Sequence, residues 1–237
     1  LQCQHRLFDQ GLFVMFATAS GGVRRNRLSD FTNVMANGKI AMKLADGDHL
    51  VRVRVFEEED NVFLATRQGK CVRFPVTDVR VFSGRTSQGV RGINLADGDE
   101  VIAMSGLKHV KTEVVVRDEY LRAVNARRRL AGGDYTDRDE DKARDEELAG
   151  ALVNLEFAEM GLEEEFILTV TADGMGKRTS AYDYRISKRG GKGIDSIDLK
   201  RGEGTLTEVV ATLPVLPTDE LVMVSDGGQL IRLPVDG

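Results

Sequence analysis

Short apolar runs recur along most of the chain, and each is followed by a glycine turn and a second run rich in β-branched residues. The clearest example is Asn61 to Met104, where two such runs precede a basic loop and the pentapeptide Leu-Ala-Asp-Gly-Asp. Runs this short, bounded by turn residues, are typical of strands and not of helices. We therefore expect this stretch to fold as one unit of four antiparallel strands.

The same pattern is written more than once. It precedes the first example in Val14 to Val53, returns in Ile167 to Leu199, and begins again at Leu221 before stopping halfway. The positions that recur in the complete copies are Thr18, Gly21, Arg25 and Asp30, then Thr66, Gly69, Arg73 and Asp78, and then Thr171, Gly174, Arg178 and Asp183. Self-similarity at a spacing of about 50 residues with strand content in each unit predicts a radially repeated, propeller-like all-β architecture.

The repeats predict a single repeat domain over residues 1–237, as part of a longer chain. The expected blades cover about 11–56, 60–105 and 163–211, with a truncated blade at 218–237 and a partly helical, acidic insertion at 106–162. The leader Leu1 to Gln10 resembles none of the repeats, and we assign it no function.

Within the insertion, Asp118 to Leu130 has apolar residues at helical spacing and ends in arginines, which predicts a helix that Gly132-Gly133 terminates. We expect Asp134 to Leu148 to be exposed and disordered, and Ala149 to Met160 to form a short helix. The apolar content is too small for us to expect a separate core.

Charge is distributed unevenly. The segment Asp134 to Glu165 holds thirteen acidic and three basic residues, a net charge of 3 − 13 = −10. Because the whole chain carries 33 − 38 = −5, the rest carries +5. The repeats are therefore basic and the insertion is acidic.

The cysteines and histidines indicate no metal site. Cys3 and Cys71 lie far apart, and Cys71 falls in an apolar run, so we expect it to be a small core residue in a reducing compartment. His5, His49 and His109 form no cluster. The chain has no run of about 18 apolar residues and no signal-like N-terminus, which predicts a soluble, cytoplasmic protein.

The common catalytic motifs are absent. The sequence has no Gly-x-Ser-x-Gly, no phosphate loop ending in Gly-Lys-Ser/Thr and no His-Glu-x-x-His. The Asp-Gly-Asp at Asp46 to Asp48 and again at Asp97 to Asp99 lacks the further acidic ligands of a calcium loop, so we interpret it as a turn.

The basic loops carry the clearest indication of function. Ser187 to Gly193, SKRGGKG, places three cations within five residues, and its glycines would let a DNA backbone come close. Asn37-Gly38-Lys39 and Gln88 to Arg91 stand at the equivalent places, and Arg85 to Arg91 is a loop bracketed by arginines. We expect these positive loops to recur along one rim. Taken alone, the arginines after the first turn also fit solvated edge-strand charge.

Together these motifs resemble the C-terminal domain of DNA gyrase A, a β-pinwheel. The resemblance spans Leu12 to Gly237 and rests on Phe16-Ala-Thr-Ala, Asn37-Gly-Lys-Ile-Ala-Met-Lys-Leu, Gly89-Val-Arg-Gly-Ile, Gly176-Lys-Arg-Thr and Arg189-Gly-Gly-Lys-Gly. The insertion is similar to one in gyrases of alphaproteobacterial type. The family's signature box is Gln-Arg-Arg-Gly-Gly-Lys-Gly, and here Ser187 and Lys188 occupy its first two positions.

The resemblance implies a non-catalytic domain that wraps duplex DNA around a basic outer rim and so allows ATP-dependent negative supercoiling. It also implies partners, namely the cleavage core of the gyrase A protein and the gyrase B protein, and it implies no cofactor here, with ATP and Mg acting elsewhere in the holoenzyme. The cations expected to neutralise phosphates are Arg24, Arg25, Lys39, Arg73, Arg91, Lys177, Arg178, Lys188, Arg189 and Lys192, with Gly190, Gly191 and Gly193 allowing close approach.

Two alternatives remain open at this point. One is the C-terminal domain of the A protein of topoisomerase IV, which has degenerate boxes, and the other is a propeller that binds protein or small ligands. A further hypothesis is that the acidic segment Asp134 to Glu165 competes with DNA for the basic rim, against the simpler interpretation of a solvated insertion.

Overall fold

The computed structural model describes residues 11–32, 34, 36–109, 111–132, 139–200 and 206–235. The leader, with Cys3 and His5, lies outside the described residues. The chain divides into two compact units. We call residues 1–109, 166–179 and 184–237 the sheet unit, and residues 110–165 and 180–183 the helical unit.

The sheet unit is built from antiparallel hairpins, most of them followed by a third strand. The first hairpin is β1 (Phe13–Thr18) and β2 (Gly22–Arg27), and the second is β4 (Asn61–Thr66) and β5 (Lys70–Pro75). The third is β8 (Phe166–Thr171) and β9 (Gly176–Ser180), and the last is β12 (Glu220–Val224) and β13 (Leu230–Pro234). Gly21, Gly69, Gly174 and Gly228 turn these hairpins with positive φ, which glycine adopts without strain.

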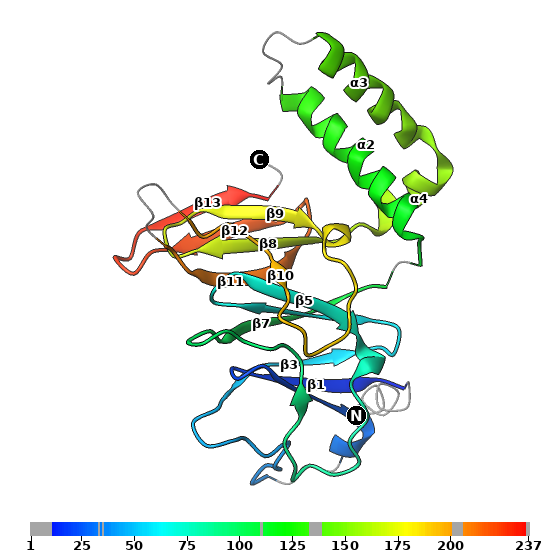
Figure 1. Ribbon diagram of the computed structural model, residues 1–237. Helices are drawn as coiled ribbons and strands as arrows, with labels where there is room; N and C mark the ends of the chain where they lie inside the picture. Colours follow the sequence, from blue (N-terminus) through cyan, green and yellow to red (C-terminus); the bar gives the residue numbers. More distant parts are fainter. Residues whose placement is uncertain are drawn as a thin grey trace. The chain divides into compact units, whose positions relative to one another are not determined.

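The third strands pair with the first strand of the hairpin before them. They are β3 (Leu50–Phe56), β7 (Val101–Leu107) and β11 (Val209–Val215), and each shows a register shift where it meets the end of its partner. Short 3-10 helices follow three of the second strands, at Leu28–Phe31, Val76–Asp78 and Ala181–Asp183. Figure 1 shows the sheets of this unit following one another in chain order. The predicted all-β fold of repeated antiparallel sheets is confirmed.

The outermost strand of each four-stranded sheet comes from the next repeat. The first sheet has the order β3-β1-β2-β6, and the second has the order β10-β5-β4-β7, where β6 is Val90–Arg91 and β10 is Ile194–Asp195. The expectation that Asn61 to Met104 forms one four-stranded unit is therefore wrong. This stretch supplies three strands to its own sheet and lends the fourth to the sheet before it, because each second strand has an open edge that the following chain segment can pair.

Two glycines make this exchange possible. A Cβ on Gly89 would overlap the Val23 carbonyl oxygen, and one on Gly193 would lie 2.5 Å from the Cys71 carbonyl oxygen. Real Cβ atoms do not come this close to a carbonyl oxygen in either case. The exchanged segments can therefore approach the second strands only where the side chain is missing.

The core of the sheet unit lies across these exchanged sheets. Met15 and Val23 of the first repeat pack in one cluster with Leu64 and Phe74 of the second and with Ile93 on the exchanged segment. Cys71 is buried, as expected from its apolar run. The first two repeats therefore share one hydrophobic interior, whereas Phe166, Leu168, Val215 and Val235 of the later repeats form a separate cluster.

The helical unit consists of α2 (Val114–Gly132), α3 (Asp139–Gly150), a 3-10 turn (Ala151–Val153) and α4 (Leu155–Glu163) (Figure 1). The helix expected at Asp118 to Leu130 is confirmed, and it ends at Gly132. The expectation of disorder over Asp134 to Leu148 is wrong from Asp139 onward, where α3 is helical, and residues 134–138 lie outside the described part.

The helical unit also has a core of its own, contrary to the expectation from its composition. Tyr120 packs edge-on against Phe157 and Tyr182, with ring centroids 5.7 and 5.6 Å apart. Tyr120 donates a hydrogen bond to Glu164 at 2.8 Å, and Tyr182 donates to the Met160 carbonyl at 3.1 Å. The sequence count missed this core because Tyr182 comes from a segment beyond the insertion, and a few large aromatic rings bury much area.

Replacing Gly89 by alanine should destabilise the sheet unit by about 1–3 kcal/mol, because the new methyl group must push the exchanged segment off β2. Gly191→Ala is the matched control. Its Cβ would meet nothing closer than the Lys188 carbonyl oxygen at 4.0 Å, so its unfolding free energy should change by less than about 0.5 kcal/mol. Urea unfolding of the two variants tests this, and equal stability would contradict the exchange.

The Cys71 thiol should be unreactive in the folded protein. Burial raises the pKa of Cys71 to about 12, so the thiol stays protonated at pH 8 and lies out of reach of reagents. In a Cys3→Ser background, a disulfide reagent should label Cys71 only after urea unfolds the chain. Rapid labelling in buffer would show that β5 opens locally without global unfolding.

Candidate nucleic-acid interface

Three chain segments occupy equivalent places in the sheet unit, and we call them the rim segments: residues 36–44, 83–94 and 187–198. The second crosses the open edge of β2, where the Phe82 amide donates to the Arg25 carbonyl at 2.8 Å and the Gly92 amide to the Gly21 carbonyl at 2.8 Å. The third crosses β5 in the same way, from Ser187 to Arg73 and from Ser196 to Gly69, both at 2.8 Å.

Neighbouring rim segments are hydrogen-bonded to each other. The Lys43 amide donates to the Ser87 carbonyl at 3.3 Å, and the Asn94 amide donates to the Gly191 carbonyl at 2.8 Å. Lys43 and Asn94 hold the same position in their repeats, so the two contacts are equivalent. The three rim segments therefore form one continuous row of backbone.

Cations stand exposed along this row. Lys39, Lys43, Arg91, Lys188 and Lys192 are exposed on the rim segments themselves, and Arg80 and Arg185 are exposed just before two of them. Two cavities open at these segments. One of about 270 Å³ is lined in part by Lys43 and Arg91, and one of about 290 Å³ in part by Lys188 and Lys192. The row can thus present positive charge to a polyanion.

Three of the predicted phosphate ligands are instead buried. Arg24 is fully buried, and Arg25 and Arg73 are each 5% exposed, so none of them can reach a phosphate from its present position. The Arg25 guanidinium stacks over the Phe13 ring at 4.5 Å, and its buried Nε and Nη1 have no hydrogen-bond partner in the described structure. Burial lowers the pKa of Arg25. Arg73 donates to the Lys108 carbonyl at 2.8 Å.

The repeated arginine is therefore a structural position. Arg178 repeats the arrangement, since it stacks over Phe166 at 5.2 Å and donates to the Val235 carbonyl at 3.2 Å. Phe166 is the residue equivalent to Phe13. In the fourth copy the equivalent pair is Arg232 and Glu220, which form an ion pair. The first, third and fourth copies thus retain a contact between the first and second strands, and in the second copy Arg73 bonds the Lys108 carbonyl instead. Sequence alone could not tell this position from a surface charge.

The basic Gly-rich loop is divided between exposed and anchored groups. Lys188 and Lys192 are exposed, but Arg189 donates to the Asp78 carbonyl at 2.9 Å and to the Arg91 carbonyl at 2.8 Å. Arg189 therefore ties the third rim segment to the second repeat.

The glycines of this loop differ in role. Gly193 permits the close approach to the Cys71 carbonyl, Gly190 adopts φ +81°, and Gly191 is exposed with open space around it. Of the three, Gly191 is the exposed one. Lys177 is exposed on β9, outside the rim segments.

Sequence reasoning left four cations out of the expected contacts, namely Lys43, Arg80, Arg85 and Arg185. Aligning Lys43 with Asn94 and Asp198 by repeat would have found its place on the row.

The Asp-Gly-Asp turns are confirmed as turns: Asp48 accepts from the Ser20 amide at 3.0 Å, and Asp99 from the Gln68 amide at 2.9 Å. Over the described residues, no group of three or more His, Cys, Asp or Glu side chains could hold a metal ion.

Comparison with known proteins places these features in a family. The family model described as "DNA gyrase C-terminal domain, beta-propeller" matches residues 13–57, 60–106, 165–212 and 219–237. The DNA gyrase A protein of Granulibacter bethesdensis is 51% identical over 234 residues, and that of Rickettsia bellii is 44% identical over 227 residues. These alignments cover 96% and 95% of this chain but 25% and 24% of the relatives. The chain thus spans about a quarter of the curated relatives it matches.

Solved structures agree on the fold. A topoisomerase IV C-terminal domain superposes with a TM-score of 0.66 at 16% identity, and a DNA gyrase A C-terminal domain with a TM-score of 0.63 at 21% identity. Both alignments cover 97% of this chain, and they cover 54% and 57% of the solved chains. In the described part of the chain, no helix has the length and apolarity that crossing a membrane requires.

The buried arginine of the repeat should matter for stability and the exposed lysine of the loop should not. Arg25→Ala removes the stacking on Phe13 and leaves a cavity, which should cost about 2 kcal/mol of unfolding free energy. Arg25→Met keeps most of the volume and should recover most of that loss, since Arg25 forms no ion pair in the described part of the chain. Lys188→Ala should stay within about 0.5 kcal/mol of the parent. Urea unfolding decides, and an Arg25→Ala variant as stable as the parent would overturn the assignment.

Proposed function

The chain belongs to the family of DNA gyrase C-terminal domains, and from that premise we propose that its sheet unit binds duplex DNA along the rim segments and bends it. The sequence relatives favour gyrase over topoisomerase IV, because the 51% identity is to a gyrase A protein whereas the topoisomerase IV structure shares 16% and speaks only for the fold.

The single observation that supports this function most is the continuous row of rim segments with exposed Lys39, Lys43, Arg91, Lys188 and Lys192. A duplex presents closely spaced phosphates, so a row of cations can neutralise several at once and release their counterions. These contacts fix the position of the duplex without reading its sequence.

The energies are compatible with bending. Non-specific phosphate binding with a Kd near 10⁻⁵ M corresponds to roughly 7 kcal/mol, whereas bending a short site by 40–90° costs of the order of 1–6 kcal/mol. The two terms are similar in size, so neighbouring rim segments must engage the duplex together. DNA deformability, not base contact, should then set which sequences are preferred.

In the longer protein, we propose that the bent DNA leads a segment to the cleavage core of gyrase A and so directs negative supercoiling. The hydrolysis of ATP and the Mg-dependent steps would occur in other parts of the holoenzyme, with the gyrase B protein as the ATP-hydrolysing partner. The domain itself would contribute DNA binding and no catalytic group or cofactor. We propose that it works in the bacterial cytoplasm, on the nucleoid.

That the acidic segment Asp134 to Glu165 competes with DNA for the basic rim stays a prediction. Its α3 is rich in Asp and Glu, and one of these, Asp145, is buried and held by Arg129 at 2.7 Å. The exposed acids of α3 would have to act on DNA binding through their charge.

DNA binding should be steeply salt-dependent and should rest on the rim. In a fluorescence anisotropy titration with a duplex of about 40 base pairs, the logarithm of the affinity should fall with the logarithm of the salt concentration by about 0.9 per phosphate contact. The double variant Lys188→Ala/Lys192→Ala should reduce this slope by about 2 and weaken binding.

Arg52→Ala is the control, because Arg52 is an exposed cation on β3, at the edge of the first sheet opposite to β6. It should leave both the affinity and the slope nearly unchanged. Salt-independent binding, or equal losses in the rim variant and the control, would favour a protein-binding propeller instead.

A further inference from the structure

Arg24 lies beneath the rim loop Ser83 to Gln88 and is surrounded by backbone oxygens. Its guanidinium donates to the carbonyl of Ser87 at 2.5 Å and to the carbonyl of Gly84, and it also donates to the Ser87 hydroxyl at 3.0 Å. The side chain of Asn26, fixed by Arg24 Nε at 2.9 Å, donates to the Phe82 carbonyl at 2.7 Å and to Gly84 at 3.2 Å. Two buried side chains thus hold three carbonyls pointing inward, those of Gly84 and Ser87 in the loop and that of Phe82 just before it.

The inward carbonyls determine where the loop amides point. All peptide bonds in the described chain are trans, so the N–H that follows an inward carbonyl is directed the opposite way. These are the amides of Ser83, Arg85 and Gln88, and none of them donates to an acceptor in the described structure. Ser83 and Gln88 are exposed and Arg85 is half-buried. The loop therefore turns three unpaired N–H groups toward solvent.

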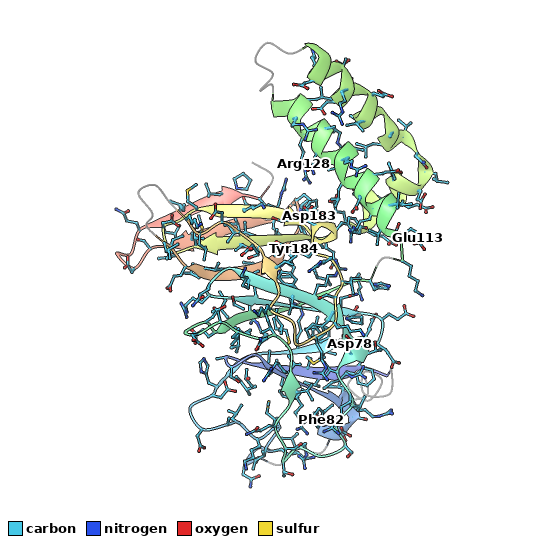
Figure 2. All side chains as sticks on the ribbon, in the orientation of Figure 1. Asp78, Phe82, Glu113, Arg128, Asp183 and Tyr184 are labelled. Carbon is cyan, nitrogen blue, oxygen red and sulfur yellow. The ribbon has the colours of Figure 1, made fainter. Side chains whose placement is uncertain are left out.

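The loop also sits over more positive than negative charge: three arginines lie at it, and the carboxylate of Asp30 accepts from the Asn26 side chain at 3.5 Å. In the described chain Arg24 forms no ion pair, and both Arg24 and Arg80 lie over the Phe82 ring, at 4.4 and 4.1 Å from its centre. Arg85 has a buried Nη1 without a hydrogen-bond partner. Figure 2 shows Phe82 below Asp78 along the segment that leads from the second sheet to the first. An anion bound at this loop would meet donors and a local excess of positive charge together.

We propose that Ser83 to Gln88 is a phosphodiester-binding loop whose backbone amides receive one DNA phosphate, and that the buried Arg24 is its positioning residue. This rests on the proposed function. Arg24 then acts on DNA binding through the loop, by keeping the carbonyls inward and the amides outward, without touching the phosphate.

This anchoring by Arg24 and Asn26 occurs only where the second repeat covers β2 of the first, among the repeats that the structure describes. At the positions equivalent to Arg24, the second and third repeats have Val72 and Lys177, and at the position of Asn26 they have Phe74 and Thr179. The third rim segment is held by Arg189 instead, through Asp78 and Arg91. The two loops therefore need not contribute equally to DNA binding.

Amide chemical shifts test the loop directly. In ¹H–¹⁵N spectra of the 237-residue chain, inorganic phosphate and, separately, a short duplex should shift the amide protons of Ser83, Arg85 and Gln88 downfield. In Arg24→Met, which is uncharged and cannot hold carbonyls, these shifts should vanish and affinity for the duplex should fall about tenfold. Shifts that persist in Arg24→Met would overturn the role of Arg24.

A double-mutant cycle separates positioning from a general loss of structure. Arg24→Met should be non-additive with Arg85→Ala, on the same loop, and additive with Lys188→Ala, on the other loop. If both pairs are additive, the positioning role is wrong. Should Arg24→Met not fold, Arg24→Lys replaces it, because lysine keeps the charge but lacks the planar fork that spans several carbonyls. It too should lose the three shifts, and retention of them would contradict the proposal.

The outcomes also separate this inference from the proposed function. A parent chain that binds the duplex with a steep salt dependence, but shows no shift at the three amides, overturns the loop and leaves DNA binding intact. A parent chain that does not bind the duplex overturns the function, and the phosphate titration still decides whether the loop receives the anion.

Discussion

The structure depends on the exchange of an outer strand between consecutive repeats. A second strand such as β2 or β5 would present an unpaired edge, and the following repeat covers it through the backbone bonds from Phe82 to Arg25 and from Ser187 to Arg73. The approach is so close that Gly89 and Gly193 admit no side chain. This one contact joins the hydrophobic interiors of neighbouring repeats, and it also sets the rim segments side by side. The candidate interface is thus a direct product of the way the sheets are completed.

The arginines of this chain divide into two groups with opposite environments. Arg24, Arg25 and Arg73 are buried. Arg24 and Arg73 donate to backbone carbonyls, and Arg24 and Arg25 stack on aromatic rings. A planar guanidinium suits such sites because it can both donate hydrogen bonds and stack. The exposed cations of the rim are mostly lysines. Their flexible side chains can reach phosphates whose positions change as the duplex bends. The net charge of the repeats therefore says little about which residues contact DNA, because some of the positive charge belongs to buried arginines that stabilise the fold.

The fold is shared between the gyrase and topoisomerase IV domains, so the fold by itself does not choose between their activities. The sequence relatives show the family, since the identity of this chain to gyrase A proteins extends over nearly its whole length. Within this chain, the helical unit has an aromatic core of its own, and the rim loops are anchored by individual side chains such as Arg24 and Arg189.

The sequence by itself determined the all-β fold class, the glycine turns and the family, because these follow from local periodicity and from motifs read in chain order. It also located the exposed Lys39, Arg91, Lys188 and Lys192 at matching places. Only the tertiary structure decided that β6 and β10 complete the sheets of preceding repeats, that Arg25 and Arg73 are buried, and that Tyr182 closes the core of the helical unit. The reason is physical: strand pairing, burial and aromatic packing join residues that are distant in sequence, and an Arg at a given place in a strand has the same local pattern whether a neighbouring segment covers it or not.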